Sequence, residues 1–144
     1  MTTLNNSILK LSDKSYIHAS TDISGAGLAG SLYELATQNS VEIIVNAKDV
    51  PYYEQALTYA MSMEEDGALF NRNYVGSLVR FDESVSKGYE NLFYDPQTSG
   101  GLLLAVAPSE LNHLADKLHA DGVMAEKLVI GQVLDEGSPR VLVA

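Results

Sequence analysis

Residues 95–103 read Asp95-Pro96-Gln97-Thr98-Ser99-Gly100-Gly101-Leu102-Leu103, a turn that runs directly into an apolar segment. The proline fixes its own φ and removes one backbone donor, and the two glycines permit close approaches that a Cβ would prevent. Thr98 and Ser99 place hydroxyls beside backbone N–H groups, a combination suited to phosphate or another oxyanion. Two interpretations stay open: an oxyanion-binding loop, or a structural turn that feeds a core strand over 102–106.

A second glycine turn lies upstream and reads Thr21-Asp22-Ile23-Ser24-Gly25-Ala26-Gly27-Leu28. It follows a strand-like run and precedes a helix pattern in which Leu28, Leu32 and Leu35 share one face. A helix that starts at such a turn offers free N–H groups and the positive end of its dipole to an anion. Asp22 could hold a divalent cation over a bound phosphate or simply cap the turn. A Gly-x-Gly pair is by itself weak evidence for a nucleotide site.

Together the two turns resemble the C-terminal domain of selenophosphate synthetase (selenide, water dikinase). That family typically reads Thr-Asp-Val-Thr-Gly-Phe-Gly-Leu at the first turn, and the second turn matches its pattern at every position of 95–103. Asn71-Arg72-Asn73, after Gly67, resembles the family's Arg-Asn segment, and Ile130-Gly131-Gln132-Val133 resembles its closing strand. The opening, 1–12, resembles the helix that precedes this domain. The resemblance therefore covers essentially all of 1–144 and predicts a single domain.

The resemblance implies a fold and a function. The fold is α+β, with a mixed β-sheet of about four to six strands and packed helices, similar to the C-terminal domain of aminoimidazole ribonucleotide synthetase. The function is the C-terminal, ATP- and Mg²⁺-binding half of an enzyme that converts ATP, selenide and water to selenophosphate, AMP and phosphate. Asp22 would hold the magnesium ion. The residues expected to contact ATP or its phosphates are Thr21, Ser24, Gly25, Gly27, Asn73, Thr98, Ser99, Gly100 and Gly101.

The chain departs from the family pattern in three places. Ala26 stands where Phe is usual, Ser31 stands where His is frequent, and no threonine follows Gly67. The family also has an N-terminal domain that carries a reactive Cys or selenocysteine, an essential Lys and further Asp ligands, whereas this chain contains no cysteine. We therefore name no catalytic residue and expect the chain to be inactive alone. The alternatives are a non-catalytic binding module and half of another ATP-dependent enzyme of the same superfamily.

Composition and charge narrow the partners. The net charge of −10 and the scattered Lys and Arg residues argue against nucleic acid. The same charge would repel ATP unless cations intervene, which favours magnesium as a bridge. No apolar run approaches the roughly 20 residues that span a bilayer, and the N-terminus does not resemble a signal peptide. We expect a cytoplasmic protein without membrane contact whose partners are ATP and either a separate N-terminal-type domain or a second copy.

Periodicity predicts alternating helices and strands. A helix pattern begins near Asp49 and Pro51, with Tyr53, Ala56, Leu57, Ala60 and Met61 on an apolar face that predicts core packing. The segment 64–94 is the least regular, and a strand is expected near 74–80. The strand patterns of 127–134 and 140–143 are joined by a turn at 137–139. The remaining predicted helices are 3–12, 26–38 and 108–122, and the remaining predicted strands are 16–20, 41–45 and 102–106.

The histidines and the acidic run offer weaker candidates. His18 lies on the same side of its strand as Asp22, so it either touches the ligand site or is structural. His113 and His119 are six residues apart on one helix and do not share a face as metal ligands would. Three consecutive acids at 64–66 are typical of a solvated helix end, with a metal site as the alternative.

Overall fold

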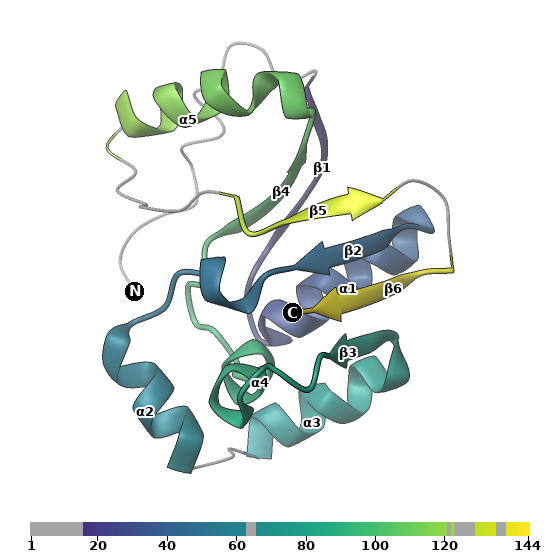
Figure 1. Ribbon diagram of the computed structural model, residues 1–144, viewed down its shortest axis with the longest axis vertical. Coiled ribbons are helices and arrows are strands. Elements are labelled where there is room, and N and C mark those ends of the chain that lie inside the picture. Colours follow the sequence, from purple (N-terminus) through teal and green to yellow (C-terminus); the bar gives the residue numbers. More distant parts are fainter. Residues whose placement is uncertain (1–15, 63–65, 121, 123–128, 135–137) are drawn as a thin grey trace.

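The computed structural model describes residues 16–62, 66–120, 122, 129–134 and 138–144, which form two β-sheets with packed helices (Figure 1). The larger sheet has the strand order β3-β6-β2-β5. β2 runs parallel to β6, β6 runs parallel to β3, and β5 is antiparallel to β2, so the sheet is mixed. The predicted α+β class is confirmed. The strands are β2 (Glu42–Val45), β3 (Val79–Phe81), β5 (Gly131–Leu134) and β6 (Arg140–Val143).

A separate two-stranded ribbon carries the two glycine turns at one end. β1 (Ile17–Asp22) and β4 (Leu102–Val106) pair antiparallel, with Asp22 opposite Leu102. At the other end of the ribbon lie the 3₁₀ turn η4 (Pro108–Glu110) and α5 (Leu111–Ala120). Tyr16 and Leu114 are buried in a small apolar cluster there. The ribbon therefore has its own packing and places both turns against the body of the domain.

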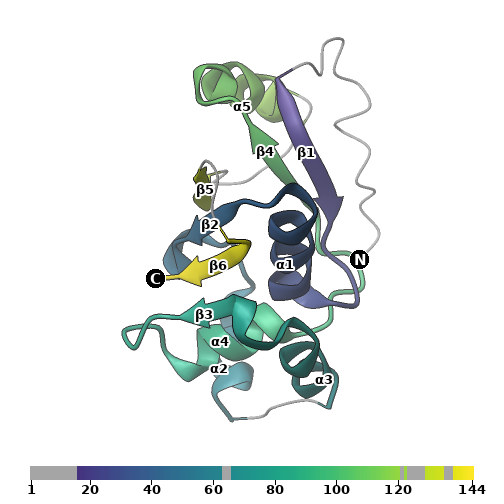
Figure 2. The ribbon, with the colours of Figure 1, turned by 90° about the vertical axis from the view of Figure 1, so that its right-hand side faces the viewer.

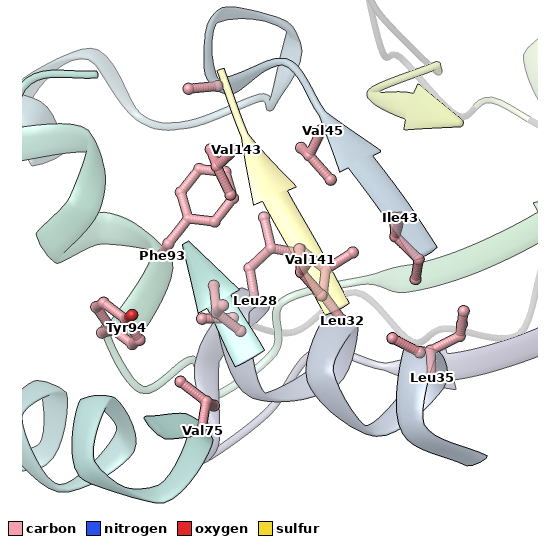
Figure 3. Packing of buried hydrophobic residues seen from close by; sticks show 14 of the residues in the cluster. Leu28, Leu32, Leu35, Ile43, Val45, Val75, Phe93, Tyr94, Val141 and Val143 are labelled. Carbon is pink, nitrogen blue, oxygen red and sulfur yellow. The ribbon is translucent and has the colours of Figure 1, made fainter. Parts of the chain in front are cut away.

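The main core lies between α1 (Gly27–Asn39) and the four-stranded sheet (Figure 3). The predicted leucine face of α1 points at the valines and isoleucine of β2 and β6, and α4 (Lys87–Tyr94) adds Phe93 and Tyr94. α1 ends at Ser40, whose left-handed φ of 53° turns the chain into β2. The labelled core residues are Leu28, Leu32, Leu35, Ile43, Val45, Val75, Phe93, Tyr94, Val141 and Val143.

Three helices lie below this core in Figure 2: α2 (Glu54–Ser62), α3 (Asp66–Val75) and α4. The strand predicted over 74–80 is wrong for most of its length, because α3 continues to Val75 and only Val79–Phe81 is a strand. Gly76, with φ +57°, ends the helix, and the 3₁₀ turn η3 (Gly76–Leu78) leads into the sheet. Another short 3₁₀ turn, η2 (Ala47–Asp49), precedes α2.

The predicted core stripe on α2 is also wrong. No residue of this helix is buried, and Met61 and the preceding Tyr53 are 68% and 84% exposed. α2 packs mainly on the neighbouring short helix α4, where a Cβ at Gly88 would lie 2.6 Å from Met61 Cγ. A helix that lies at the edge of the domain and packs mainly on one neighbour buries its apolar face only in part, whatever its periodicity.

Two strand relationships do not follow the order of the chain. β5 and β6 do not pair with each other but flank β2 on opposite sides. β1 and β2, which precede and follow α1, belong to different sheets. The helix predicted over 3–12 and the start of the strand predicted from 127 lie outside the described residues. Among the described residues, no helix has the length and apolar character needed to cross a bilayer.

Candidate functional site

The first corner, defined as residues 21–27, connects β1 to α1. Its backbone turns where the Gly27 N–H donates to the carbonyl of Ser24 (3.0 Å). Asp22 is exposed at the end of β1, and its carbonyl accepts a hydrogen bond from the buried Ser31 hydroxyl (3.0 Å). No side chain caps the start of α1 and no acid lies in its first turn. The positive end of the helix dipole is therefore not neutralised by α1's own residues.

The second corner, defined as residues 95–101, connects α4 to β4. The Gln97 side chain donates to the carbonyl and to the carboxylate of Asp95, both at 3.1 Å, which fixes the start of the turn. Thr98, Ser99 and Gly100 are exposed. Gly101 adopts a φ of +101°, a conformation that favours glycine over any residue with a Cβ.

The two corners lie against each other. The Ile23 N–H donates to the Gly101 carbonyl, and the Gly100 N–H donates to the Ile23 carbonyl, both at 3.0 Å. The Gln97 N–H also reaches the Ser24 carbonyl (2.9 Å). Three backbone groups of the first corner are thus fixed by the second.

Glycine is required at this junction. A Cβ at Gly27 would lie 2.8 Å from the carbonyl oxygen of Phe93, and Gly27 has a φ of +69°. A Cβ at Gly100 would lie 2.5 Å from the carbonyl oxygen of Ile23. Gly25, by contrast, has nothing within 4 Å of a built Cβ. The glycines therefore allow the close approach of the corners, and Gly25 is tolerant of a side chain.

Asn71 on α3 joins both corners, and the sequence analysis did not select it. This buried side chain donates to the carbonyl of Gly25 (2.9 Å) and to the carbonyl of Tyr94 (2.8 Å), directly before the second corner. Asn73, which the sequence analysis named as a ligand contact, is exposed on the same helix. Within the described residues, it forms no hydrogen bond with either corner. A polar residue two positions away on a helix faces a different direction, which local sequence alone did not resolve.

Arg72 fastens α3 to α4 beneath the second corner. It forms an ion pair with Glu90, donates to Asn91 Oδ1 (3.1 Å) and lies over the ring of Tyr94, 4.4 Å from the centroid. Burial raises the pKa of Tyr94 above its usual value, although the nearby Arg72 charge acts in the opposite direction. Asn91 in turn donates to the carbonyl of Ala60 on α2 (2.8 Å). These contacts hold the three lower helices together.

A pocket of about 390 Å³ opens beside both corners and is called the corner pocket here. Its polar rim includes the Glu34 carboxylate, which accepts a hydrogen bond from the Tyr74 hydroxyl (3.2 Å), and this hydrogen bond raises the pKa of Tyr74. The remaining lining is mainly apolar. The corner pocket is lined by Gly25, Ala26, Glu34, Gly67, Phe70, Asn71, Tyr74 and Pro96.

The other candidates contribute less to this region. His18 and Asp22 both point to the exposed side of β1, as the alternation predicted. His113 lies on α5 with its ring edge-on to Tyr16, at 6.3 Å between centroids. Within the part of the chain that the structure describes, no three His, Cys, Asp or Glu side chains gather as a metal site would require. Of the acidic run, Glu64 and Glu65 lie outside the described residues.

Comparisons with known proteins agree with the fold and the motifs. Residues 2–144 match the family described as AIR synthase related protein, C-terminal domain. A selenide, water dikinase from Pelobacter propionicus is 40% identical over 144 residues, which cover 99% of this chain and 41% of the relative. The selenide, water dikinase of Treponema denticola is 40% identical over 119 residues, covering 82% of this chain and 33% of the relative.

A third relative, selenide, water dikinase 2 of Peptoclostridium acidaminophilum, is 34% identical over 144 residues, covering 99% of this chain and 41% of the relative. The chain thus spans about two-fifths of the length of the curated relatives that it matches from end to end. The family match, in contrast, extends over nearly every residue. This chain belongs to the AIR synthase related protein family, and it corresponds to the C-terminal domain of that family.

Proposed function

We propose that this chain is the C-terminal part of a selenophosphate synthetase and provides one wall of its site for magnesium and ATP. The reaction would convert ATP, selenide and water to selenophosphate, AMP and phosphate. The observation that supports the proposal is the junction of the two corners, in which backbone hydrogen bonds hold the turn after the exposed Asp22 against the turn that carries Thr98 and Ser99. The names of the relatives support the choice of reaction.

Asp22 would supply one ligand to the magnesium ion. Its carboxylate is exposed at the end of β1, so it can reach a cation held between the protein and a polyphosphate. Mg²⁺ accepts one or two protein carboxylates and completes its octahedron with water and phosphate oxygens, so a single Asp fits as part of a site but not as a whole one. The cation would neutralise charge on the phosphates, which a chain with a net charge of −10 otherwise repels.

The corners would position the phosphates. Thr21 and Ser24 from the first corner, and Thr98 and Ser99 from the second, carry hydroxyls that can donate to phosphate oxygens. Gly25, Gly27, Gly100 and Gly101 shape the backbone around them, and the start of α1 adds its dipole. Asn73 remains a predicted ligand contact from the exposed side of α3. Phosphoryl transfer depends mainly on such positioning and on charge neutralisation, so these residues would contribute to binding but would not activate selenide.

The test is calorimetric titration of the chain with Mg-ATP. We expect binding that Asp22→Ala weakens by about tenfold or more, the loss of roughly 1.4 kcal/mol of charge-assisted contact. Asp116→Ala is the matched control, because Asp116 is an exposed acid on α5, remote from both corners in the fold. Equal Mg-ATP affinity in the wild-type chain and the Asp22 variant would refute the metal role.

A second candidate function is a non-catalytic module that docks onto a separate ATP-binding domain. The exposed aromatic residues of α2 and α3 favour it, because large exposed apolar side chains are typical of a contact surface. Tyr53, Tyr59, Phe70 and Tyr74 are 84%, 68%, 71% and 48% exposed. Under this alternative the chain would bind its partner but not Mg-ATP, so the same titration separates the two candidates.

A further inference from the structure

The corner pocket combines an apolar lining with a fixed shape. Phe70 is 71% exposed and stands at the rim of the pocket, so its apolar surface is open to a partner. The floor is held by the two hydrogen bonds of Asn71, and the wall is held by Tyr74, which bonds Glu34 and packs edge-on against Tyr33 at 5.4 Å. The pocket is thus formed in advance of any occupant.

Its position relates it to the proposed site. Gly25 and Ala26 belong to the first corner and Pro96 belongs to the second, and all three line the pocket. Gly67 on α3 packs against the ring of Pro96, where a built Cβ would lie 2.7 Å from the proline Cγ. A group inserted into the corner pocket would therefore touch the same two turns that we expect to hold the phosphates.

The chemistry of the pocket favours an apolar occupant over a phosphate group. Both N–H groups of the Asn71 side chain are already donated to backbone carbonyls, and among the described lining residues the only charged side chain is the Glu34 carboxylate. That carboxylate would repel an anion, whereas an apolar side chain with a basic neighbour would find both an apolar wall and an acceptor. The pocket therefore suits a side chain of a polypeptide.

We propose that the corner pocket receives an apolar side chain from the polypeptide that completes the magnesium–ATP site, with Phe70 as its main contact. The inference rests on the proposed function. That function leaves the site short of metal ligands, and this chain spans only 41% of its Pelobacter relative. The occupant is therefore a domain of the kind that makes up the rest of such relatives. It must lie beside the corners to contribute its ligands, and the corner pocket is the apolar surface found there.

The experiment uses the part of the Pelobacter propionicus selenide, water dikinase that lies outside the matched 144 residues, expressed on its own. Its binding to the present chain is measured by calorimetry for wild type, Phe70→Glu and Phe70→Leu. Tyr53→Glu is the matched control, because it also places an acid on a highly exposed aromatic position but lies just before α2, outside the pocket lining. Urea unfolding of every variant verifies that the fold is kept.

We expect Phe70→Glu to weaken binding by about tenfold or more, as for a central aromatic contact. The affinities of Phe70→Leu and Tyr53→Glu should each stay within about twofold of wild type. Phe70→Leu keeps an apolar contact in the pocket, and Tyr53 lies outside the pocket lining. Equal binding by wild type and Phe70→Glu would overturn the proposal, and so would a lack of binding by the wild-type chain. Sedimentation that shows a wild-type dimer lost in Phe70→Glu would also overturn it, by identifying the occupant as a second copy.

The failure of this inference is distinguishable from failure of the proposed function. Asp22→Ala leaves the lining of the corner pocket intact, so it should retain docking while it loses Mg-ATP affinity. Docking that depends on Phe70, together with Mg-ATP binding that is independent of Asp22, would support the corner pocket as a docking site and refute the metal role of Asp22. Mg-ATP binding that depends on Asp22, with docking indifferent to Phe70, would refute only the surface.

Discussion

The side-chain amide of Asn71 lies 2.9 Å from the carbonyl oxygen of Gly25, a residue 46 positions earlier in the chain. The same amide nitrogen donates to Tyr94, 23 positions later. One buried side chain therefore sets the distance between the first corner and the end of α4, from which the second corner starts. The geometry of the candidate site depends on α3, an element that contributes no residue to either glycine motif.

Replacing Asn71 by Leu should destabilise the protein by about 2–3 kcal/mol, because it leaves the buried Tyr94 carbonyl and the partly buried Gly25 carbonyl without their donor. The free energy of unfolding is measured by urea denaturation. Asn73→Leu on the exposed side of the same helix is the control and should change stability by about 0.5 kcal/mol or less. A similar small change in both variants would mean that Asn71 does not anchor the corners.

Gly27→Ala should destabilise the chain by about 2 kcal/mol or more, because a residue with a Cβ is strained in the left-handed region and here also meets a backbone carbonyl. Gly27 has a φ of +69°, and a Cβ built on it would lie 2.8 Å from the carbonyl oxygen of Phe93. Gly25→Ala, two residues earlier, meets nothing within 4 Å and should be close to neutral. Thermal unfolding of both variants checks this contrast, and equal losses would argue against the close approach of the corners.

Tyr94 should make stability fall at alkaline pH. Burial raises its pKa in the folded state, so the neutral ring is favoured there. The resulting stabilisation is complete below the unfolded pKa of about 10 and is lost as the pH rises through the higher folded value. Unfolding in urea at about pH 8 and about pH 11 should show a smaller decline in Tyr94→Phe than in wild type. The stability of Tyr53→Phe, a change at an exposed residue, should decline between these pH values as much as that of wild type does.

Much of the fold follows from local pattern. The leucines at 28, 32 and 35 predicted the core face of α1, and the apolar runs predicted β2, β4 and β6. The helices α3 and α4 were missed because their stabilising contacts are not periodic. They depend on Arg72 reaching Glu90 and on Asn71 reaching two distant carbonyls. Gly67, Asn71 and Asn73 also lower the intrinsic helix propensity of α3.

The candidate site was predictable to a similar extent. The glycine turns could be identified from spacing, and the pairing of β1 with β4 in the structure explains why the turns meet. The anchoring roles of Asn71 and Ser31 could not, because each depends on a partner that the fold brings near. The exposed apolar face of α2 misled the prediction for the same reason. Periodicity identifies an apolar face, but only the arrangement of neighbours determines whether it is covered.

The purified chain should produce no AMP in response to selenide and ATP. It contains no cysteine, and the described residues hold no cluster of metal ligands, so activation of selenide would require groups from elsewhere. The assay compares AMP formation with and without selenide, and an intact selenide, water dikinase serves as the positive control. Selenide-dependent AMP from the chain alone would contradict its assignment as part of a site.

The central claim is that the two corners and Asp22 form a single wall for phosphate and magnesium. Backbone amide chemical shifts, followed by NMR as Mg-ATP is added, test it residue by residue. The claim predicts that the largest changes fall on 21–27 and 98–101 together and that Asp22→Ala suppresses both sets. Changes confined to one corner, changes located on α5, or an unaltered response in the Asp22 variant would contradict it.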